Sequence, residues 1–423
     1  MGRRLLIDLG PLRASPPFRR LFLAQSVSLM GSQLTAVAVA FQVFSLTHSS
    51  LQVGAVSATQ LVPFVGGALV GGAQVGPRAR RAVLVVGSVL MAGCSAALAG
   101  NALAGARASV APVYLATALA AGLSGVIATT LTASVPSLVG AGQLTGAFAT
   151  MQVIDQLGMV AGPAAGGVMI AALGLPWLYG ADSLTFLWAA AFLWSTTPGR
   201  PRSRPGRGDG ARTPGDGGGS ERRGVLDGLR YLRGRPVLEG AYVVDLCATL
   251  FGSPRAVFPA LVRDRFHGGA AVLGVLYATP AAGALVGSLT SGWLGALRRP
   301  GRAVLVAVGG WGAAITVLGF APVLWVAIVP LVVAGWADVV SAVLRSALVQ
   351  AAVHERYRAR MSGVQMAVVE GGPRLGDLES GALASAVSTS FSIVSGGLLC
   401  LAGTVAVGLA FPALRAYRRG DGP

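Results

Sequence analysis

Long apolar segments separated by short polar ones run along almost the whole chain. Each apolar segment has about 20 residues, the length of an α-helix that crosses a hydrocarbon core of about 30 Å. The pattern predicts an all-α polytopic membrane protein with twelve transmembrane helices. The expected spans are 21–44, 51–74, 82–104, 111–135, 145–172, 176–197, 237–262, 270–295, 303–321, 322–345, 361–386 and 389–412.

The composition agrees with a membrane protein and excludes other classes. Hydrophobic residues make up 53% of the 423 residues and charged residues 12%, whereas a soluble domain carries roughly 25% charged residues. The chain is therefore neither disordered, nor a coiled coil, nor a disulfide-stapled secreted domain. Cys94, Cys247 and Cys400 lie singly inside apolar segments, so we interpret them as small hydrophobic side chains and not as metal ligands or redox groups.

The positive charge is distributed in a way that is typical of membrane orientation. The formal net charge is +17, and all 33 basic residues are arginines. Apart from Arg374 they lie between or at the ends of apolar segments, without the continuous basic stripe that binds nucleic acid. With the N-terminus inside, 28 arginines fall on the inner side and four on the outer side: Arg107, Arg255, Arg263 and Arg265. The positive-inside rule then places both termini in the cytoplasm.

A polar segment divides the chain into two halves of six expected spans each. Residues 198–224 contain nine glycines, four prolines and seven arginines, a composition typical of a flexible linker. Residues 225–235 alternate apolar residues with arginines and suit a short helix on the inner leaflet. The expected organisation is an N-terminal bundle (1–197), a cytoplasmic linker (198–236), a C-terminal bundle (237–414) and a cytoplasmic tail (415–423).

The two halves share short sequences at matching positions. Gly-Ala-Leu-Val-Gly occurs at 67–71 and at 283–287, and Arg-Ala-Val-Leu-Val follows at 81–85 and at 302–306. Gly-Pro-x-x-Gly occurs at 162–166 and at 372–376. Two six-helix repeats would place these copies in register. Duplicated halves with a site between them are typical of secondary transporters.

With these motifs the chain resembles the major facilitator superfamily, and within it the branch that exports drugs and siderophores. The resemblance covers nearly the whole chain. It is carried by Phe-Arg-Arg-Leu-Phe-Leu-Ala-Gln-Ser at 18–26, by Gly158-x-x-x-Gly162-Pro163-x-x-Gly166-Gly167, and by Gly-Gly-Pro-Arg-Leu-Gly-Asp-Leu-Glu at 371–379. The resemblance implies proton-driven export with alternating access between the two halves.

Two positions depart from the pattern of this family. Gly76 stands where the loop after the second span usually has an aspartate, which weakens the usual account of closure on the inner side. Residues 114–134 of the fourth span are uncharged and lack the arginine of many proton antiporters. The second departure leaves the identity of the proton relay open.

Ionisable side chains inside apolar spans cost about 2.5–3.5 kcal/mol each on insertion scales, so those that occur are candidates for function. We expect proton coupling at Asp155, Asp245, Asp338 and Glu370, with Asp155 and Asp245 at similar depth and facing a central cavity. The alternative is that each carboxyl group pairs with an arginine or caps a broken helix. We interpret Asp182, near the start of the sixth span, as a helix-start acid.

Glu370, Arg374 and Asp377 are spaced i, i+4 and i+7, which places them on one face of a continuous helix. Two acids then flank one arginine, and a structural ion cluster is the favoured interpretation. The alternative is that Arg374 and Asp377 contact an anionic substrate. Further polar and aromatic side chains complete a candidate cavity for a bulky amphipathic ligand: Gln33, Thr35, Gln152, Gln156, Phe251 and Trp336.

Small residues recur every four positions in the fifth and eighth spans, which lets helix backbones approach closely. The residues are Gly158, Gly162, Pro163, Gly166, Gly167, Gly283 and Gly287. If these two spans face each other across the halves, the glycine surfaces slide or rock during transport. The alternative is static packing.

The chain lacks the signatures of an enzyme, of a metal site and of a cofactor site. It has no lysine for a P-loop, its three histidines lie in separate loops, and it has no Gly-x-Ser-x-Gly motif. We expect a monomer in the bacterial plasma membrane that exports a small amphipathic molecule, a siderophore or a drug, and whose other partners are protons and membrane lipid. A sensor or scaffold of the same fold, and a passive channel, are the alternatives.

Overall fold

The structure is a computed structural model that describes residues 10–75, 79–140, 143–195, 230–353 and 358–418. Within these ranges all regular elements are helices. The twelve expected spans correspond to α2 (Pro16–Thr47), α3 (Ser50–Thr59) with α4 (Leu61–Gln74), α5 (Arg80–Leu103), α6 (Val110–Leu138), α7 (Leu144–Leu173), α8 (Leu175–Trp194), α10 (Pro236–Phe251) with η3 (Arg255–Val257) and α11 (Phe258–Asp264), α12 (Ala270–Thr290) with η4 (Ser291–Ala296), α13 (Pro300–Leu318), α14 (Leu324–Ala352), α15 (Arg358–Ala386) and α16 (Thr389–Ala410). Three short helices, α1 (Gly10–Ala14), η1 (Gly105–Arg107) and α17 (Pro412–Ala416), lie outside the spans.

In the described part of the chain, nine helices are long and apolar enough to cross a membrane on their own. The other three spans are α8, the broken α10–α11, and α15. Helix α8 contains Asp182, α10 has only 16 residues, and α15 carries four charged residues between Glu370 and Glu379.

Local sequence signals set the ends of several helices. The hydroxyl groups of Ser15, Ser49 and Ser388 accept hydrogen bonds from backbone N–H groups in the first turns of α2, α3 and α16, which satisfies donors that a helix start leaves unpaired. Gly174, with φ of 88°, separates α7 from α8; a residue with a side chain rarely adopts this conformation.

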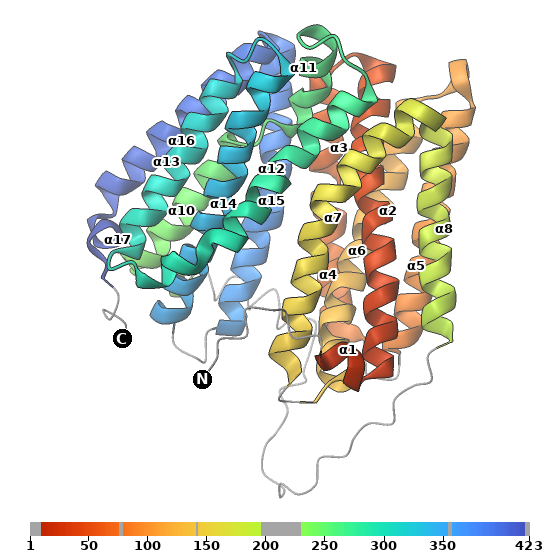
Figure 1. Cartoon of the computed structure of the whole chain (residues 1–423), viewed down its shortest axis with the longest axis horizontal. Helices are drawn as coiled ribbons and strands as arrows, with labels where there is room; N and C mark the ends of the chain where they lie inside the picture. The colour runs from red at the N-terminus through yellow and green to blue at the C-terminus, as the bar shows by residue number, and fades with distance from the viewer. Residues whose placement is uncertain (1–9, 76–78, 141–142, 196–229, 354–357, 419–423) are drawn as a thin grey trace, which may run out of the picture.

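The helices form two bundles, α2–α8 and α10–α16, that lie side by side (Figure 1). We call the end at which α8 ends and α10 begins the linker end. The opposite end, which carries His48 and α11, is called the distal end. Helices α1 and α17 both lie at the linker end. The bundles approach each other at the distal end and diverge towards the linker end (Figure 1).

The repeated Gly-Ala-Leu-Val-Gly sequence packs in the same way in both halves. A Cβ atom on Gly67 would lie 1.9 Å from the Gly122 carbonyl oxygen of α6, and one on Gly283 would lie 2.1 Å from the Val332 carbonyl oxygen of α14. The second span therefore packs against the fourth, and the eighth against the tenth, at a separation that only glycine permits.

The repeated Gly-Pro-x-x-Gly sequence is equally matched between the halves. In α7, a Cβ atom on Gly162 would lie 2.4 Å from the Gln33 Cβ atom of α2. In α15, one on Gly372 would lie 2.2 Å from the Thr249 hydroxyl oxygen of α10. The fifth span thus packs on the first and the eleventh on the seventh, which supports the predicted duplication.

These contacts correct the expected role of the glycine stripes. Helices α7 and α12 do pack across the halves, and of the predicted residues Pro163 and Gly167 make this contact. Gly158, Gly162 and Gly166 face α2, and Gly283 and Gly287 face α14, so the stripes seal each half internally. The contact across the halves is made by Gly167, whose Cβ atom would lie 2.5 Å from the Ala270 carbonyl oxygen and 2.8 Å from the Gly274 Cα atom.

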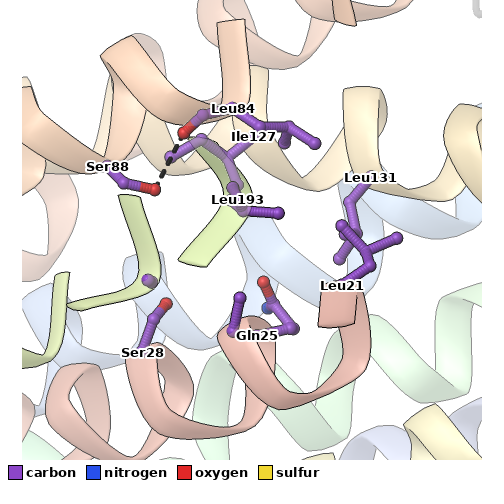
Figure 2. A pocket seen from close by; sticks show the side chains of 10 residues that line it. Leu21, Gln25, Ser28, Leu84, Ser88, Ile127, Leu131 and Leu193 are labelled. Carbon is purple, nitrogen blue, oxygen red and sulfur yellow. Dashed lines mark hydrogen bonds between the residues drawn. The ribbon is translucent and has the colours of Figure 1, made fainter. Parts of the chain in front are cut away.

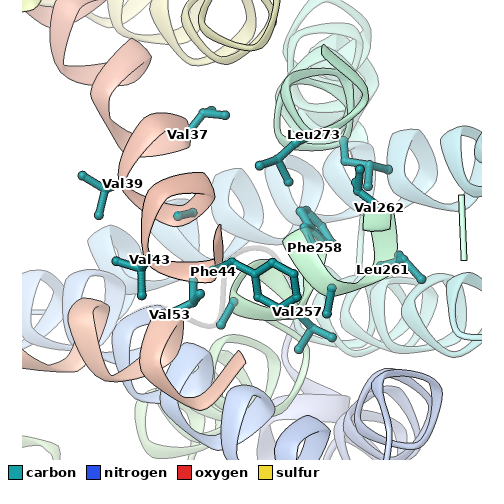
Figure 3. Packing of buried hydrophobic residues seen from close by; sticks show 14 of the residues in the cluster. Val37, Val39, Val43, Phe44, Val53, Val257, Phe258, Leu261, Val262 and Leu273 are labelled. Atoms are coloured by element: carbon teal, nitrogen blue, oxygen red, sulfur yellow. The ribbon is translucent and has the colours of Figure 1, made fainter. Parts of the chain in front are cut away.

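The core is shared between the halves only at the distal end, as far as the described residues show. One buried cluster contains Val37, Val43 and Phe44 of α2 together with Phe258 and Leu273 of the C-terminal half (Figure 3). The other four buried clusters each belong to a single half. We call the contact between the halves at the distal end the distal seam. It also includes a hydrogen bond of 3.0 Å from the Leu51 N–H to the Ser385 hydroxyl oxygen.

The seventh and tenth expected spans differ from the observed helices in ways that position charged residues. The predicted span 237–262 is broken after Phe251, because Pro254 has no backbone N–H and restricts the residue before it. Side chains satisfy the carbonyl groups at the break: Trp311 Nε1 donates to Gly252 and the Ser380 hydroxyl donates to Ser253. The predicted span 322–345 extends to Ala352.

The expected linker and tail are described only in part. Residues 196–229, which include most of the linker, and Gly76 lie outside the described residues. From the linker segment that is described, Leu232 belongs to the buried core of the C-terminal half. Tyr417, in the expected tail, is buried in the same core.

Candidate functional site

Asp245 and Arg345 form a buried ion pair between α10 and α14. The Arg345 guanidinium donates to Asp245 Oδ1, and the two side chains are 5% and 10% exposed, Asp245 being the more buried. The length of α14 is what brings the arginine into the bundle. Arg345 is therefore not the inner-loop residue that the arginine distribution predicts, because α14 continues for seven residues beyond it. Asp245 is one of the expected proton-coupling residues, and here it has the arginine partner that the alternative interpretation required.

Asp338 lies two helical turns before Arg345 on α14, and its side chain is exposed. It interacts electrostatically with Arg345 and with Arg255. Arg255 belongs to η3, immediately after the break in the seventh span, and it is also exposed. Because Arg255 interacts with acids of α14 and α15, it belongs with the charged groups of the C-terminal half and not with the outer-loop arginines.

Helix α15 carries the charges that meet the N-terminal half. Arg374 pairs with Glu370 at 2.8 Å, as the i, i+4 spacing predicts, and its guanidinium lies 4.7 Å from the centre of the Phe64 ring of α4. Asp377 is buried and interacts with the Ser57 hydroxyl of α3 and the Ala256 N–H. Asp377 interacts electrostatically with Arg374, so the three residues are linked as their spacing predicts, and it interacts more strongly with Arg255.

These residues form a connected row of alternating charges in the C-terminal half. We call it the charge row, and its members in spatial order are Glu370, Arg374, Asp377, Arg255, Asp338, Arg345 and Asp245. Four carboxyl groups share three guanidinium groups. One negative charge is therefore left without an arginine when all the carboxyl groups are ionised, and a bound proton would remove it.

The N-terminal half has a different arrangement. Asp155, in α7, is half-buried, and in the part of the chain that the structure describes it has neither an ion pair nor a hydrogen bond. It lies seven residues before Gly162 and thus on the helix face that packs against α2. Asp155 therefore keeps the features of a proton-coupling candidate, a carboxyl group in a span without a counter-charge.

Asp182 is not the helix-start acid that the sequence analysis expected. It lies in the interior of α8, and its side chain accepts hydrogen bonds from Thr35 of α2 and Ser95 of α5. The sequence alone favours a helix start because Tyr179-Gly180-Ala181 directly precede Asp182, and a glycine often marks a break in a helix. The signal that was available is the position of an acid among apolar residues on both sides.

The expected cavity residues are divided among several places. Thr35 points into the N-terminal bundle, where it donates to Asp182 at 2.7 Å. Trp336 packs on α12, donating to the Thr290 hydroxyl oxygen at 3.2 Å. Gln33 lies beneath Gly162. Gln152 is exposed, and Gln156 and Phe251 are half-buried. Of the predicted lining, Arg374 and Asp377 are the members that reach the other half.

Two cavities in the described part of the chain each lie within one half. The first is small, about 20 Å³, and is lined by apolar side chains with Gln25, Ser28 and Ser88 (Figure 2). A space of this size holds about one water molecule. The second, of about 280 Å³, lies at the linker end between η4, α14 and Tyr417. Neither is lined by the residues predicted for the substrate cavity.

Comparison with known proteins shows the family. A family model described as a transmembrane secretion effector of the major facilitator type matches residues 7–418, so the chain belongs to this family. It is a multi-pass membrane transporter and not an enzyme, as predicted. The enterobactin exporter EntS of Citrobacter koseri is 32% identical over 408 residues, which cover 94% of each chain. EntS of Escherichia coli O1:K1 is 30% identical over the same coverage.

Solved structures share the fold at low sequence identity. The nucleoside transporter NupG has a TM-score of 0.71 and 13% identity, covering 95% of this chain and all of its own. A POT-family peptide transporter in complex with alafosfalin has a TM-score of 0.73 and 10% identity, with 96% of each chain covered. At these identities the likeness shows the arrangement of helices alone.

Proposed function

We propose that this transporter exports a siderophore of the enterobactin type in exchange for protons that move inward. The similarity to EntS over 94% of both chains supports the substrate class. The charge row supports the coupling, since four carboxyl groups share three arginines, and this is the observation that carries the proposal.

The charge row offers a simple exchange between proton and substrate. Arg345 interacts with both Asp245 and Asp338, so a proton on either acid weakens one of its two attractions. A catecholate siderophore bears ionisable hydroxyl groups that an arginine can bind. Arg374, which already contacts Phe64 in the other half, combines a positive charge with an aromatic face, as recognition of such a ligand requires.

The distribution of contacts between the halves supports alternating access. The distal seam is formed by a buried apolar cluster and by close backbone contact at Gly167, whereas the clusters towards the linker end each belong to one half. We infer that this conformation is open at the linker end. Export then requires the seam to separate while the linker ends come together.

The arginine distribution supports a cytoplasmic linker end. With Arg345 and Arg255 assigned to the charge row and left out of the loops, 27 arginines remain on the inner side and three on the outer side. The positive-inside rule then places the linker end in the cytoplasm. One proton that moves inward through 100 mV releases about 2.3 kcal/mol, which sustains a substrate gradient of roughly 50-fold.

The test uses the full-length protein in liposomes with an imposed proton gradient, and enterobactin as the probe. We expect enterobactin to accumulate against its own gradient and the accumulation to collapse on addition of a protonophore. Asp245→Asn and Asp338→Asn should each reduce gradient-driven accumulation at least about tenfold. Asp264→Asn, which changes an exposed acid of α11, is the matched control and should transport normally.

Other outcomes would contradict the proposal in distinct ways. Enterobactin accumulation that is unchanged by the protonophore would show that transport is not driven by protons. Flux that only equilibrates enterobactin would indicate a passive channel. Specific binding without any flux would favour the sensor or scaffold that the sequence analysis left open.

A further inference from the structure

A second buried acid lies in the N-terminal half, away from the charge row. Asp182 is only 1% exposed. Its Oδ2 atom accepts a hydrogen bond of 2.7 Å from the Thr35 hydroxyl of α2 and one of 2.6 Å from the Ser95 hydroxyl of α5. Its Oδ1 atom is buried and, among the described residues, has no hydrogen-bond partner. The carboxyl group thus joins three helices through one oxygen and leaves the other unpaired.

No basic group compensates this carboxyl group in the described structure. The side chains that act on it are the hydroxyl groups of Thr35, Ser95 and Thr185, from α2, α5 and α8. The titratable group that faces it is Tyr179, one turn earlier on α8, whose hydroxyl donates to Gln42 Oε1 at 2.8 Å. Burying an ionised carboxyl group with two neutral donors and no counter-charge is unfavourable in free energy, so the state with a bound cation has the lower free energy.

The close packing around the unpaired Asp182 Oδ1 atom determines whether the bound cation is a metal ion or a proton. A Cβ atom on Gly31 would lie 2.2 Å from Asp182 Oδ1 and 2.3 Å from the Thr185 hydroxyl oxygen. Asp182 Oδ1 therefore occupies the space that a side chain at Gly31 would take, and it lies directly against the backbone of α2. A metal ion would need several oxygen ligands at more than 2 Å around it, and this packing leaves no room for one. A proton fits.

We propose that Asp182 is a second proton-binding site of this transporter, protonated in the conformation described here and able to exchange its proton when α2 separates from α5 and α8. The helix that covers the site is also the helix that closes the distal seam. Gly31 and Thr35 lie on α2, and one to three turns further along the same helix are Val37, Val43 and Phe44 of the seam. Loss of the proton leaves a charge that must be hydrated, which favours movement of α2.

The role in energy coupling rests on the proposed function, but binding of the proton does not. The experiment therefore has two readouts on the full-length protein in liposomes. The first is the infrared band of protonated carboxyl groups, recorded for the wild type and for Asp182→Asn. The second is enterobactin transport, measured with an imposed proton gradient and, separately, as downhill efflux without one.

Asp182→Asn preserves an acceptor for Thr35 and Ser95 but cannot bind a proton. We expect this variant to lack one component of the protonated-carboxyl band, to lose gradient-driven accumulation at least about tenfold, and to retain downhill efflux within about twofold. Ser183→Ala is the matched control, because Ser183 lies on the same helix and donates to Ala92 of α5 without contacting Asp182. It should behave like the wild type.

Two results would overturn the inference: an unchanged carboxyl band in Asp182→Asn, or gradient-driven accumulation within twofold of the wild type. Should Asp182→Asn fail to fold, Ser95→Ala removes one donor to Oδ2 and must shift the same band, and an unshifted band is equally fatal. If the wild type shows no proton-driven transport but the band component is present, the proposed function fails and the proton site stands.

Discussion

At the residue scale, the Asp245–Arg345 pair is the contact with the largest expected effect on stability. Removing one partner of a buried ion pair leaves an uncompensated charge, at a cost of about 3–5 kcal/mol. We predict a loss of this size for Arg345→Ala. We further predict that Asp245→Asn combined with Arg345→Ala recovers part of it. Chemical unfolding of the four proteins of this double-mutant cycle in detergent micelles measures both effects.

An exposed pair provides the control for this cycle. Arg263 and Asp264 are 54% and 60% exposed, so Asp264→Ala should change the unfolding free energy by no more than about 1 kcal/mol. If the effects of the two substitutions in the buried pair are additive, Asp245 and Arg345 are not energetically coupled. The charge row would then not include this ion pair as a stabilising contact.

Single residues were predictable from the sequence where their partners are local. The Glu370–Arg374 pair follows from helical spacing on one element. Arg345 and Asp182 were misjudged because each is explained by a partner on a different helix, Asp245 in α10 for the first, and Thr35 and Ser95 for the second. An arginine at the edge of an apolar segment reads as a loop residue unless the length of its helix is known.

At the scale of elements, the repeated glycines fix which helices pack within each half. We predict that Gly67→Val and Gly283→Val each lower the unfolding free energy by at least about 1–3 kcal/mol, the cost of overpacking, because the new side chains would meet backbone carbonyl groups of α6 and α14. The fraction of monodisperse protein after purification and the unfolding midpoint measure the loss.

A glycine without close neighbours is the control. A Cβ atom on Gly93 of α5 has nothing within 4 Å, so Gly93→Val should cost far less than the two packed positions. Equal losses at all three sites would mean that helix propensity, and not the close contact, determines stability here.

The seam between α7 and α12 is expected to respond differently. Gly167 contacts Ala270 and Gly274 of the other half, so Gly167→Val should disfavour the closed distal seam without disrupting either bundle. We predict a larger distance between spin labels on the distal ends of the two halves, with the unfolding midpoint nearly unchanged. An unchanged distance distribution would show that this contact does not hold the seam.

The sequence was informative about the repeats but not about which surfaces they join. Three shared motifs predicted the duplication correctly: the two glycine motifs make equivalent contacts in the two halves, and the Arg-Ala-Val-Leu-Val copies lie near the starts of α5 and α13. The helices that a glycine stripe faces depend on the arrangement of six helices in space. Gly158, Gly162 and Gly166 of α7 therefore face α2, whereas Gly167 contacts α12.

At the scale of the whole molecule, two internally sealed bundles meet at one end. The number of spans and the division at the linker were read from hydrophobic periodicity and composition, which need no long-range information. The conformation could not be read in this way, because under the alternating access that we propose one sequence supports both a closed and an open seam. What the structure adds is the location of the seam and of the charges beside it.

A reversible cross-link across the distal seam tests the central claim most directly. The Leu51 N–H donates to the Ser385 hydroxyl, so cysteines at these two positions should form a disulfide that holds the halves together. The control pair, Asn101→Cys with Ser109→Cys, joins two residues that are hydrogen-bonded to each other within the N-terminal half.

We predict that oxidation of the Leu51→Cys/Ser385→Cys protein stops proton-driven enterobactin export in liposomes and that a reductant restores it, while the control pair transports equally well in both states. Full export by the cross-linked protein would contradict the account, because transport would then proceed without opening of the distal seam.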